Sequence, residues 1–288
     1  MLKKFYYFLP YYIQNIISRL SFVLHNDIIE DFINFDYGKD YNVTKNTRLN
    51  ILYRLQISLS KVESATSLKT QIILVKQILS IKKKKNICIV ECGCYKGSST
   101  IALSIAAKII GAKLIIYDSF EGLPSSEKSI GPRNYPHLNL YGYYSKGMYK
   151  GQLADVIRNI SLFGEISVCE FRKGLFEKVL KKHKEEIQFL FIDVDLTGST
   201  KSCIKYLWKK LSDNSYVYTD DACDLKVVSI WFDNEWWRKN LNEKAPGFVG
   251  SGCGLPISGN YSGLGYVYKN KIKSKKKSSS IKISWLHQ

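Results

Sequence analysis

Residues 90–100 read Val-Glu-Cys-Gly-Cys-Tyr-Lys-Gly-Ser-Ser-Thr and join an apolar run, residues 87–90, to a helix-like run, residues 101–110. This order predicts a strand, a tight turn and a helix. Glu91 lies at the carboxyl end of the strand, and Gly93 and Gly97 let the backbone approach a ligand closely. The free N–H groups that open a helix can bind an anion. The stretch therefore predicts a cradle for a nucleoside cofactor in a doubly wound α/β fold.

The rest of the chain alternates strand-like and helix-like segments, which is typical of a mostly parallel sheet with right-handed crossovers. The expected strands after the first are residues 113–118, 166–171, 187–193, 215–219 and 264–268. The expected helices are residues 47–61, 66–81, 151–163, 175–183, 199–211 and 224–241. In such a sheet, Asp118 ends the second strand and suits a carboxylate that receives ribose hydroxyls.

We expect three parts: an N-terminal helical extension over residues 1–46, a catalytic domain over 47–270, and a basic tail over 271–288. Polar residues 36–46 predict a linker or a flexible lid. The aromatic and apolar residues 1–35 are interrupted too soon to span a membrane. They predict a helix that packs on the domain or on a second subunit, or one that lies on a membrane surface.

The amino-acid composition indicates a cellular compartment but does not identify a binding partner. The chain carries 43 Lys and Arg against 25 Asp and Glu, a formal charge of +18, which favours polyanions or anionic membranes without naming one. We expect no nucleic-acid partner. Seven cysteines spread through apolar segments are typical of reduced core residues, which predicts a cytoplasmic protein with at most peripheral membrane contact.

Carboxylates follow the predicted strands at the edge where an open α/β sheet binds ligands. Besides Glu91 and Asp118, they are Asp193 and the neighbouring pair Asp220 and Asp221. Carboxylates gathered without arginine repel one another, and a cation among them relieves that repulsion. Oxygen ligands with no nearby His or Cys favour Mg²⁺ or Ca²⁺ over zinc.

Five ordered motifs resemble those of the macrocin O-methyltransferase family. They are VECGCYKGSST at 90–100, DSFEGLP at 118–124, GLF at 174–176, IDVDLTGST at 192–200 and TDD at 219–221. The resemblance covers residues 86–225. It departs from the family pattern at Thr197, where an aromatic residue is usual.

This resemblance implies a Rossmann-like methyltransferase fold with a seven-stranded sheet. It implies S-adenosylmethionine and Mg²⁺ as cofactors, and a hydroxyl of a sugar or glycosylated compound as the acceptor. The cofactor site would be lined by Glu91, Gly93, Tyr95, Lys96, Gly97, Ser98, Asp118, Ser119, Phe120 and Gly174. The metal would be held by Asp193, Asp220 and Asp221.

A sugar hydroxyl needs a base to take its proton, and the candidate base is His137, in the long segment 125–150 between the second strand and the next helix. Asp193, at the metal site, is the second candidate catalytic residue. Two other functions are weighed. A nicotinamide-dependent oxidoreductase is disfavoured because the turn reads Gly93-x-x-x-Gly97 and not G-x-G-x-x-G. A membrane- or polyanion-binding module leaves the strand-end carboxylates unexplained.

Overall fold

The computed structural model describes residues 10, 13, 27–128, 143–222, 224–250 and 263–269. The strands are β1 (Cys88–Cys92), β2 (Lys113–Asp118), β3 (Glu127–Lys128), β4 (Tyr143–Tyr144), β5 (Cys169–Lys173), β6 (Ile187–Ile192), β7 (Leu211–Thr219) and β8 (Gly265–Lys269). The α-helices are α3 (Asp27–Asn34), α4 (Lys45–Lys61), α5 (Leu68–Leu79), α6 (Ser98–Ile110), α7 (Leu153–Phe163), α8 (Phe176–Val179), α9 (Thr197–Leu207), α10 (Leu225–Ile230) and α11 (Asn234–Leu241). Short 3₁₀ helices are η1 (Lys39–Tyr41), η2 (Ile166–Val168), η3 (Leu180–Lys182) and η4 (Trp208–Lys210).

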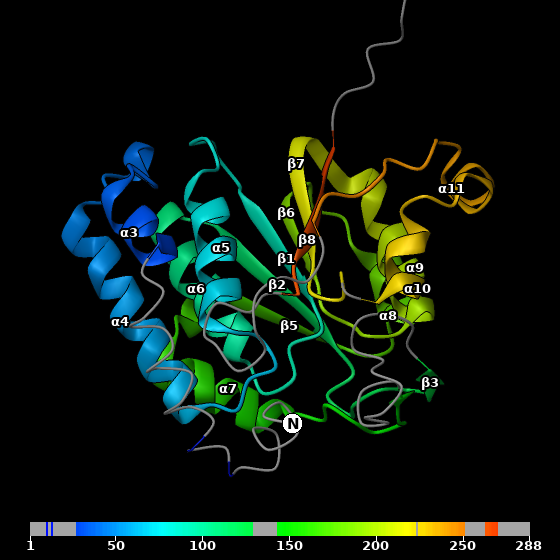
Figure 1. The fold of residues 1–288 in the computed structure, drawn as a ribbon, viewed down its shortest axis with the longest axis horizontal. Coiled ribbons are helices and arrows are strands. Elements are labelled where there is room, and N and C mark those ends of the chain that lie inside the picture. Colours follow the sequence, from blue (N-terminus) through cyan, green and yellow to red (C-terminus); the bar gives the residue numbers. More distant parts are fainter. Residues whose placement is uncertain are drawn as a thin grey trace, which may run out of the picture.

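One sheet organises these elements (Figure 1). Its strand order is β5-β2-β1-β6-β7-β8, and all neighbours are parallel except β7 and β8. The order reverses between β1 and β6, which is the switch point where doubly wound sheets bind ligands. The predicted doubly wound, mostly parallel fold is confirmed.

The main sheet has six strands among the described residues, not the expected seven. After α11, Val249 pairs with Tyr266 of β8 in an isolated antiparallel β-bridge and does not extend into a strand. The flanking Gly247 and Gly250 have φ values of 79° and 95°, a left-handed conformation that interrupts extended backbone. In the described part of the chain, two backbone hydrogen bonds between Val249 and Tyr266 therefore stand where a seventh strand would pair with β8.

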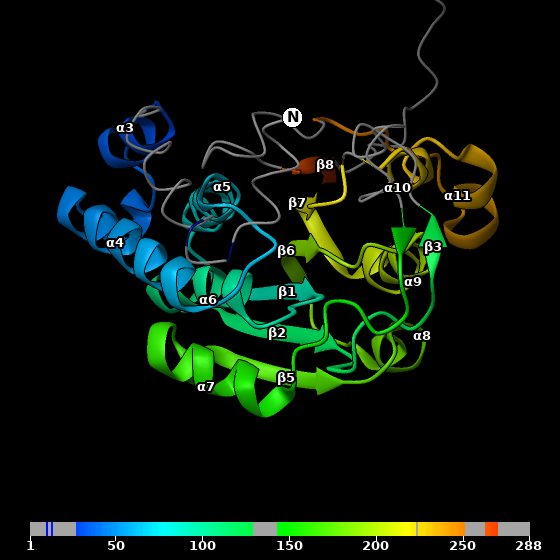
Figure 2. The ribbon, with the colours of Figure 1, turned by 60° about the horizontal axis from the view of Figure 1, so that its bottom comes forward.

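The helices cover both faces of the sheet (Figure 2). Helices α4 to α7 lie on one side, and α8 to α11 lie on the other. Every residue of β1 and β6 is buried, as central strands covered on both faces require. The two core clusters meet the sheet from opposite sides, so the edge at the carboxyl ends of the strands is left for the loops.

Most predicted helices form within a few residues of their expected ends, and one divides. The segment 224–241 forms α10 and α11 because the Asp233 carboxylate accepts a hydrogen bond from the Trp236 amide at 3.0 Å and starts a new helix. Trp231 and Trp237 are fully buried in the core. Their aromatic rings therefore serve packing.

The segment before α4 packs on the main core. The buried Arg48 side chain donates to the carbonyl oxygens of Ile33, at 3.1 Å, and Val43, at 3.2 Å. Phe32 is fully buried in the cluster that also holds α4, α5 and α6. Residues 36–46 therefore form an anchored turn and not a flexible lid, while the domain boundary at residue 46 stays a prediction.

Most of the N-terminal segment and the whole basic tail 271–288 lie outside the described residues. Within the described ranges, no helix combines the length and the apolar character needed to cross a bilayer. The predicted packing, oligomeric and membrane-surface roles of residues 1–35 therefore stay predictions.

The packing of α3 can be tested with a matched pair of substitutions. Phe32→Ala removes a fully buried ring and should lower the free energy of unfolding by about 3 to 5 kcal/mol. Phe35→Ala changes a ring that is 61% exposed at the end of the same helix and should stay within about 0.5 kcal/mol of the wild type. Urea unfolding measures both, and equal losses would contradict the docking of α3.

Candidate functional site

The turn between β1 and α6 is organised by a buried carboxylate. Glu91 is fully buried, and its two oxygens accept hydrogen bonds from the hydroxyl groups of Ser99 and Thr100, both at 2.6 Å. Burial raises the pKa of Glu91 to about 7, with a further contribution from Asp118, while the two hydroxyl groups oppose the shift. Glu91 therefore holds the start of α6 against the end of β1.

Gly93 brings the turn against the neighbouring strand end. A methyl group on its Cα would lie 1.8 Å from the carbonyl oxygen of Asp193, so only glycine fits. Its φ of 82° is also left-handed. The close approach that the sequence predicted toward a ligand is thus made first to the backbone of β6. Gly97, with a φ of 86°, opens α6 at its N-cap position.

Asp118 ties the first turn to the second. Its Oδ2 atom accepts from the Cys94 amide at 2.8 Å, and its Oδ1 atom accepts from the Phe120 amide at 2.7 Å. A carboxylate has about four acceptor positions, so lone pairs remain for a ligand. The Asp118 carbonyl oxygen also accepts from the Gly174 amide at 2.9 Å, which brings the turn after β5 to the same place. The loops of three predicted motifs converge here.

Residues 145–151 form a strap across these turns. Leu123 donates to the Met148 carbonyl oxygen and accepts from the Gly147 amide, both at 2.9 Å. The Tyr149 ring meets the Tyr95 ring edge to face, with centroids 5.6 Å apart. A Cβ on Gly151 would lie 1.8 Å from the Tyr95 carbonyl oxygen, so the strap presses directly on the first turn.

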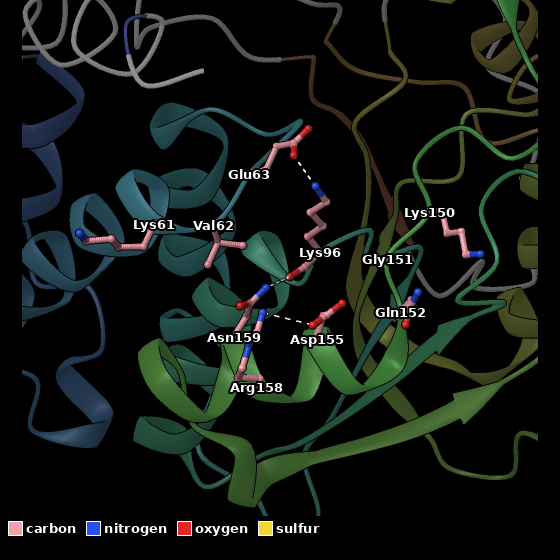
Figure 3. A pocket seen from close by; sticks show the side chains of 10 residues that line it. All are labelled: Lys61, Val62, Glu63, Lys96, Lys150, Gly151, Gln152, Asp155, Arg158 and Asn159. Atoms are coloured by element: carbon pink, nitrogen blue, oxygen red, sulfur yellow. Dashed lines mark hydrogen bonds and ion pairs between the residues drawn. The ribbon is translucent and has the colours of Figure 1, made fainter. Parts of the chain in front are cut away.

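Glu63 lies beside the candidate site, and the sequence reasoning did not single it out. It accepts a hydrogen bond from the Tyr95 hydroxyl at 2.8 Å and pairs with Lys96. Figure 3 shows this pair above the start of α7, at a cavity of about 540 Å³. The cavity is lined by Lys61, Val62, Glu63, Lys96, Lys150, Gly151, Gln152, Asp155, Arg158 and Asn159. Glu63 has no motif around it, so only the fold could reveal its place.

Strained backbone gathers at the same edge of the sheet. Tyr95, Phe120, Tyr149 and Asp195 all have φ between 47° and 59°, a region that residues with side chains rarely adopt. Each such residue costs of the order of 1 to 3 kcal/mol, and such residues cluster at functional sites. The turns around Asp118 and Asp193 are therefore shaped for more than folding.

The predicted acidic cluster forms at the ends of β6 and β7. Burial, reinforced by Asp220, Asp221 and Asp195, raises the pKa of Asp193 well above its usual range. The Asp221 Oδ2 atom accepts from the Asp195 amide at 3.0 Å and joins the two strand ends. In the described part of the chain, however, no three His, Cys, Asp or Glu side chains are arranged to hold a metal ion. His137 lies outside the described residues.

The sequence profile of the macrocin O-methyltransferase family (TylF) matches residues 75–244. This range spans both turns of the cradle and the acidic cluster. The chain belongs to the macrocin O-methyltransferase family. It is an S-adenosylmethionine-dependent O-methyltransferase, and the alternative of a nicotinamide-dependent oxidoreductase is wrong.

A solved methyltransferase structure, that of NovP, shares the fold at low sequence identity, and other methyltransferase structures are similar to a lower degree. The O-methyltransferase NovP is 16% identical, with a TM-score of 0.55, over 87% of this chain and all of NovP. The calicheamicin methyltransferase CalS11 is 15% identical, with a TM-score of 0.47, over 77% of this chain and 92% of CalS11. An O-methyltransferase from Bacillus cereus, in complex with S-adenosylhomocysteine, is 17% identical, with a TM-score of 0.42, over 76% and 91%. No curated protein matches the methyltransferase in sequence.

Strand β3, at the start of the long segment 125–150, is held beside the acidic cluster of the methyltransferase by hydrogen bonds. The Glu127 carboxylate accepts from the Thr197 amide at 3.1 Å and from the Thr197 hydroxyl at 2.8 Å. It therefore caps α9 from the β3–β4 hairpin, where a negative charge favours the helix dipole. Thr197 is the position that departs from the family pattern, and here it serves this contact.

The raised pKa of Glu91 predicts how stability depends on pH. The unfolded carboxyl ionises near pH 4.5 and the folded one near pH 7, so Glu91 costs stability as pH rises through that window and costs nothing below it. Glu91→Gln keeps the shape without the charge. The stability of this variant relative to the wild type should therefore rise by about 3 kcal/mol between pH 4.5 and pH 7.5.

Urea unfolding at several pH values measures this difference. Glu121→Gln, which changes an exposed carboxylate at the same edge, is the matched control. A constant difference between Glu91→Gln and the wild type across the range would contradict the buried, neutral state of Glu91 near pH 6.

Proposed function

We propose that the enzyme methylates a hydroxyl of a sugar or glycosylated acceptor, with Mg²⁺ assisting. The observation that supports this proposal is the close contact between Gly93 and the backbone of Asp193, because the turn between β1 and α6 then lies beside the acidic cluster, and methyl transfer needs its two reactants close together. Membership of a family named for macrocin O-methylation supports an acceptor of this class.

The cofactor residues proposed are those of the converging turns. The open lone pairs of Asp118 suit the ribose hydroxyls, and the amides at the start of α6 suit the methionine carboxylate. Ser119, Phe120 and Gly174 lie in the loops on either side of Asp118. When bound, S-adenosylmethionine supplies a methyl group on a sulfonium, which an acceptor oxygen displaces.

The metal residues proposed are Asp193, Asp220 and Asp221. The fit rests on charge: Asp193 is buried near four other carboxylates, those of Asp220, Asp221, Asp195 and Glu91, which together with burial raise its pKa. A bound divalent cation would favour the ionised form of such a cluster and polarise an acceptor hydroxyl. The base is proposed to be His137, and Asp193 is proposed to be catalytic as part of the metal site.

The cofactor assignment is tested by isothermal titration calorimetry with S-adenosylhomocysteine. The wild type should bind it, and Asp118→Ala should weaken binding by about tenfold to a hundredfold, because that change removes a charged acceptor and loosens both turns. Glu121→Ala, an exposed neighbour, should bind as the wild type does. NAD serves as the negative ligand, and an absence of S-adenosylhomocysteine binding would contradict the proposal.

The metal assignment is tested by thermal unfolding with and without Mg²⁺. The cation should raise the melting temperature of the wild type, and the effect should vanish in Asp193→Asn. The raised pKa of Asp193 means that its ionised form destabilises the fold, and Asp193→Asn removes that charge. Without metal, the variant should therefore melt at the same temperature as the wild type or higher. His137→Ala should keep the Mg²⁺ response. A response of equal size in Asp193→Asn would rule out this site.

A further inference from the structure

Seven lysines lie on α8, η3, α9 and η4, which cover one face of the sheet. They are Lys178 in α8, Lys181 and Lys182 in η3, Lys201 and Lys205 in α9, and Lys209 and Lys210 in η4. We call them the lysine face. Helices α8 and α9 lie side by side, and all but Lys201 are exposed. The same four elements contain one acidic residue, Glu177.

The charges of the lysine face are not balanced within the described part of the chain. None of its members takes part in an ion pair there. On the opposite side of the sheet, Lys76 pairs with Asp31 and Arg54 pairs with Glu165. The positive charge of this surface is therefore available to an outside partner.

The spacing of the lysines is unfavourable for the helix by itself. Lys201, Lys205 and Lys209 follow one another at intervals of four residues, so like charges lie on one stripe of α9 and its continuation η4. Like charges at this spacing destabilise a helix. An anionic partner would turn the repulsion into attraction, which gives the stripe a role beyond solubility.

Two aromatic rings are set among these lysines. The Tyr206 ring lies between Lys181 and Lys205, whose Nζ atoms are 5.7 Å and 5.8 Å from its centroid. The Lys201 Nζ atom lies 6.0 Å from the centroid of Trp236 in α11. Both rings are partly exposed. Tyr and Trp beside Lys are the side chains that settle at the boundary between lipid and water.

We propose that the lysine face docks the enzyme on an anionic phospholipid surface. Bidentate recognition of phosphates and bases in nucleic acids favours the planar guanidinium of arginine, and the lysine face contains no arginine. Lysine clusters act as point charges toward anionic headgroups. The proposal does not depend on the identity of the acceptor. Helix α9 begins two residues after Asp195, so the face extends from the rim of the candidate site.

The proposal is tested by sedimentation of the full chain with vesicles of phosphatidylcholine and phosphatidylglycerol in equal parts. The triple variant Lys201→Gln, Lys205→Gln, Lys209→Gln should bind them about a hundredfold more weakly than the wild type. The matched control is Lys82→Gln, Lys83→Gln, Lys85→Gln, which removes the same charge from an exposed loop. This control should bind as the wild type does, and added salt should release both proteins.

A second measurement locates the contact. Acetylation of lysines in the full chain should slow at Lys181, Lys201 and Lys205 when vesicles are present, and stay unchanged at Lys82 and Lys83. Unchanged S-adenosylhomocysteine binding and melting temperature in the triple variant show that it is folded. Equal vesicle binding by the two variants would overturn the proposal. So would binding of duplex DNA or RNA, but not of vesicles, through the same lysines.

Discussion

The close packing of Gly93 against the Asp193 carbonyl oxygen is the constraint on which the candidate site depends. It lies at the switch point of the sheet, between β1 and β6, and no side chain could fit in that space. Because of this contact, the turn that opens α6 and the acidic ends of β6 and β7 are neighbours. The cofactor and acceptor halves of a methyl transfer need that proximity.

Buried carboxylates then set the electrostatics of the edge. Glu91 and Asp193 both have raised pKa values, mainly through burial and further through neighbouring carboxylates. The chain has a formal charge of +18, and helix α9 leads from this edge to the lysine face, whose members form no ion pair with the described residues. The enzyme therefore keeps its acidic cluster and its basic surface on different parts of one scaffold, joined by α9.

Backbone strain and the strap explain how the turns are held. Tyr95 and Tyr149 both adopt left-handed backbone, and their rings pack edge to face across the first turn. Glu63 fixes the Tyr95 hydroxyl from the far side, after α4. Residues from three separated segments thus support one turn. Such support lets a strained conformation persist, because the surroundings leave it no lower-energy alternative.

The sequence by itself determined the fold class, the order of the strands along the chain and the motifs at their carboxyl ends. These follow from local patterns: apolar runs of strand length, helical periodicity, glycine at tight turns and acidic residues after strands. The five ordered motifs also carried the resemblance to the family.

Only the tertiary structure decided which contacts those residues make. Glu91 and Asp118 hold backbone and hydroxyl partners that come from neighbouring turns, and Gly93 accommodates a strand 100 residues away in sequence. Long-range packing likewise decided three further features. They are the single bridge at Val249 in place of a seventh strand, the start of α11 at Asp233, and the position of Glu63 beside Tyr95. Local propensity carries no information about which distant segment approaches a residue, and that approach sets the geometry and charge of the site.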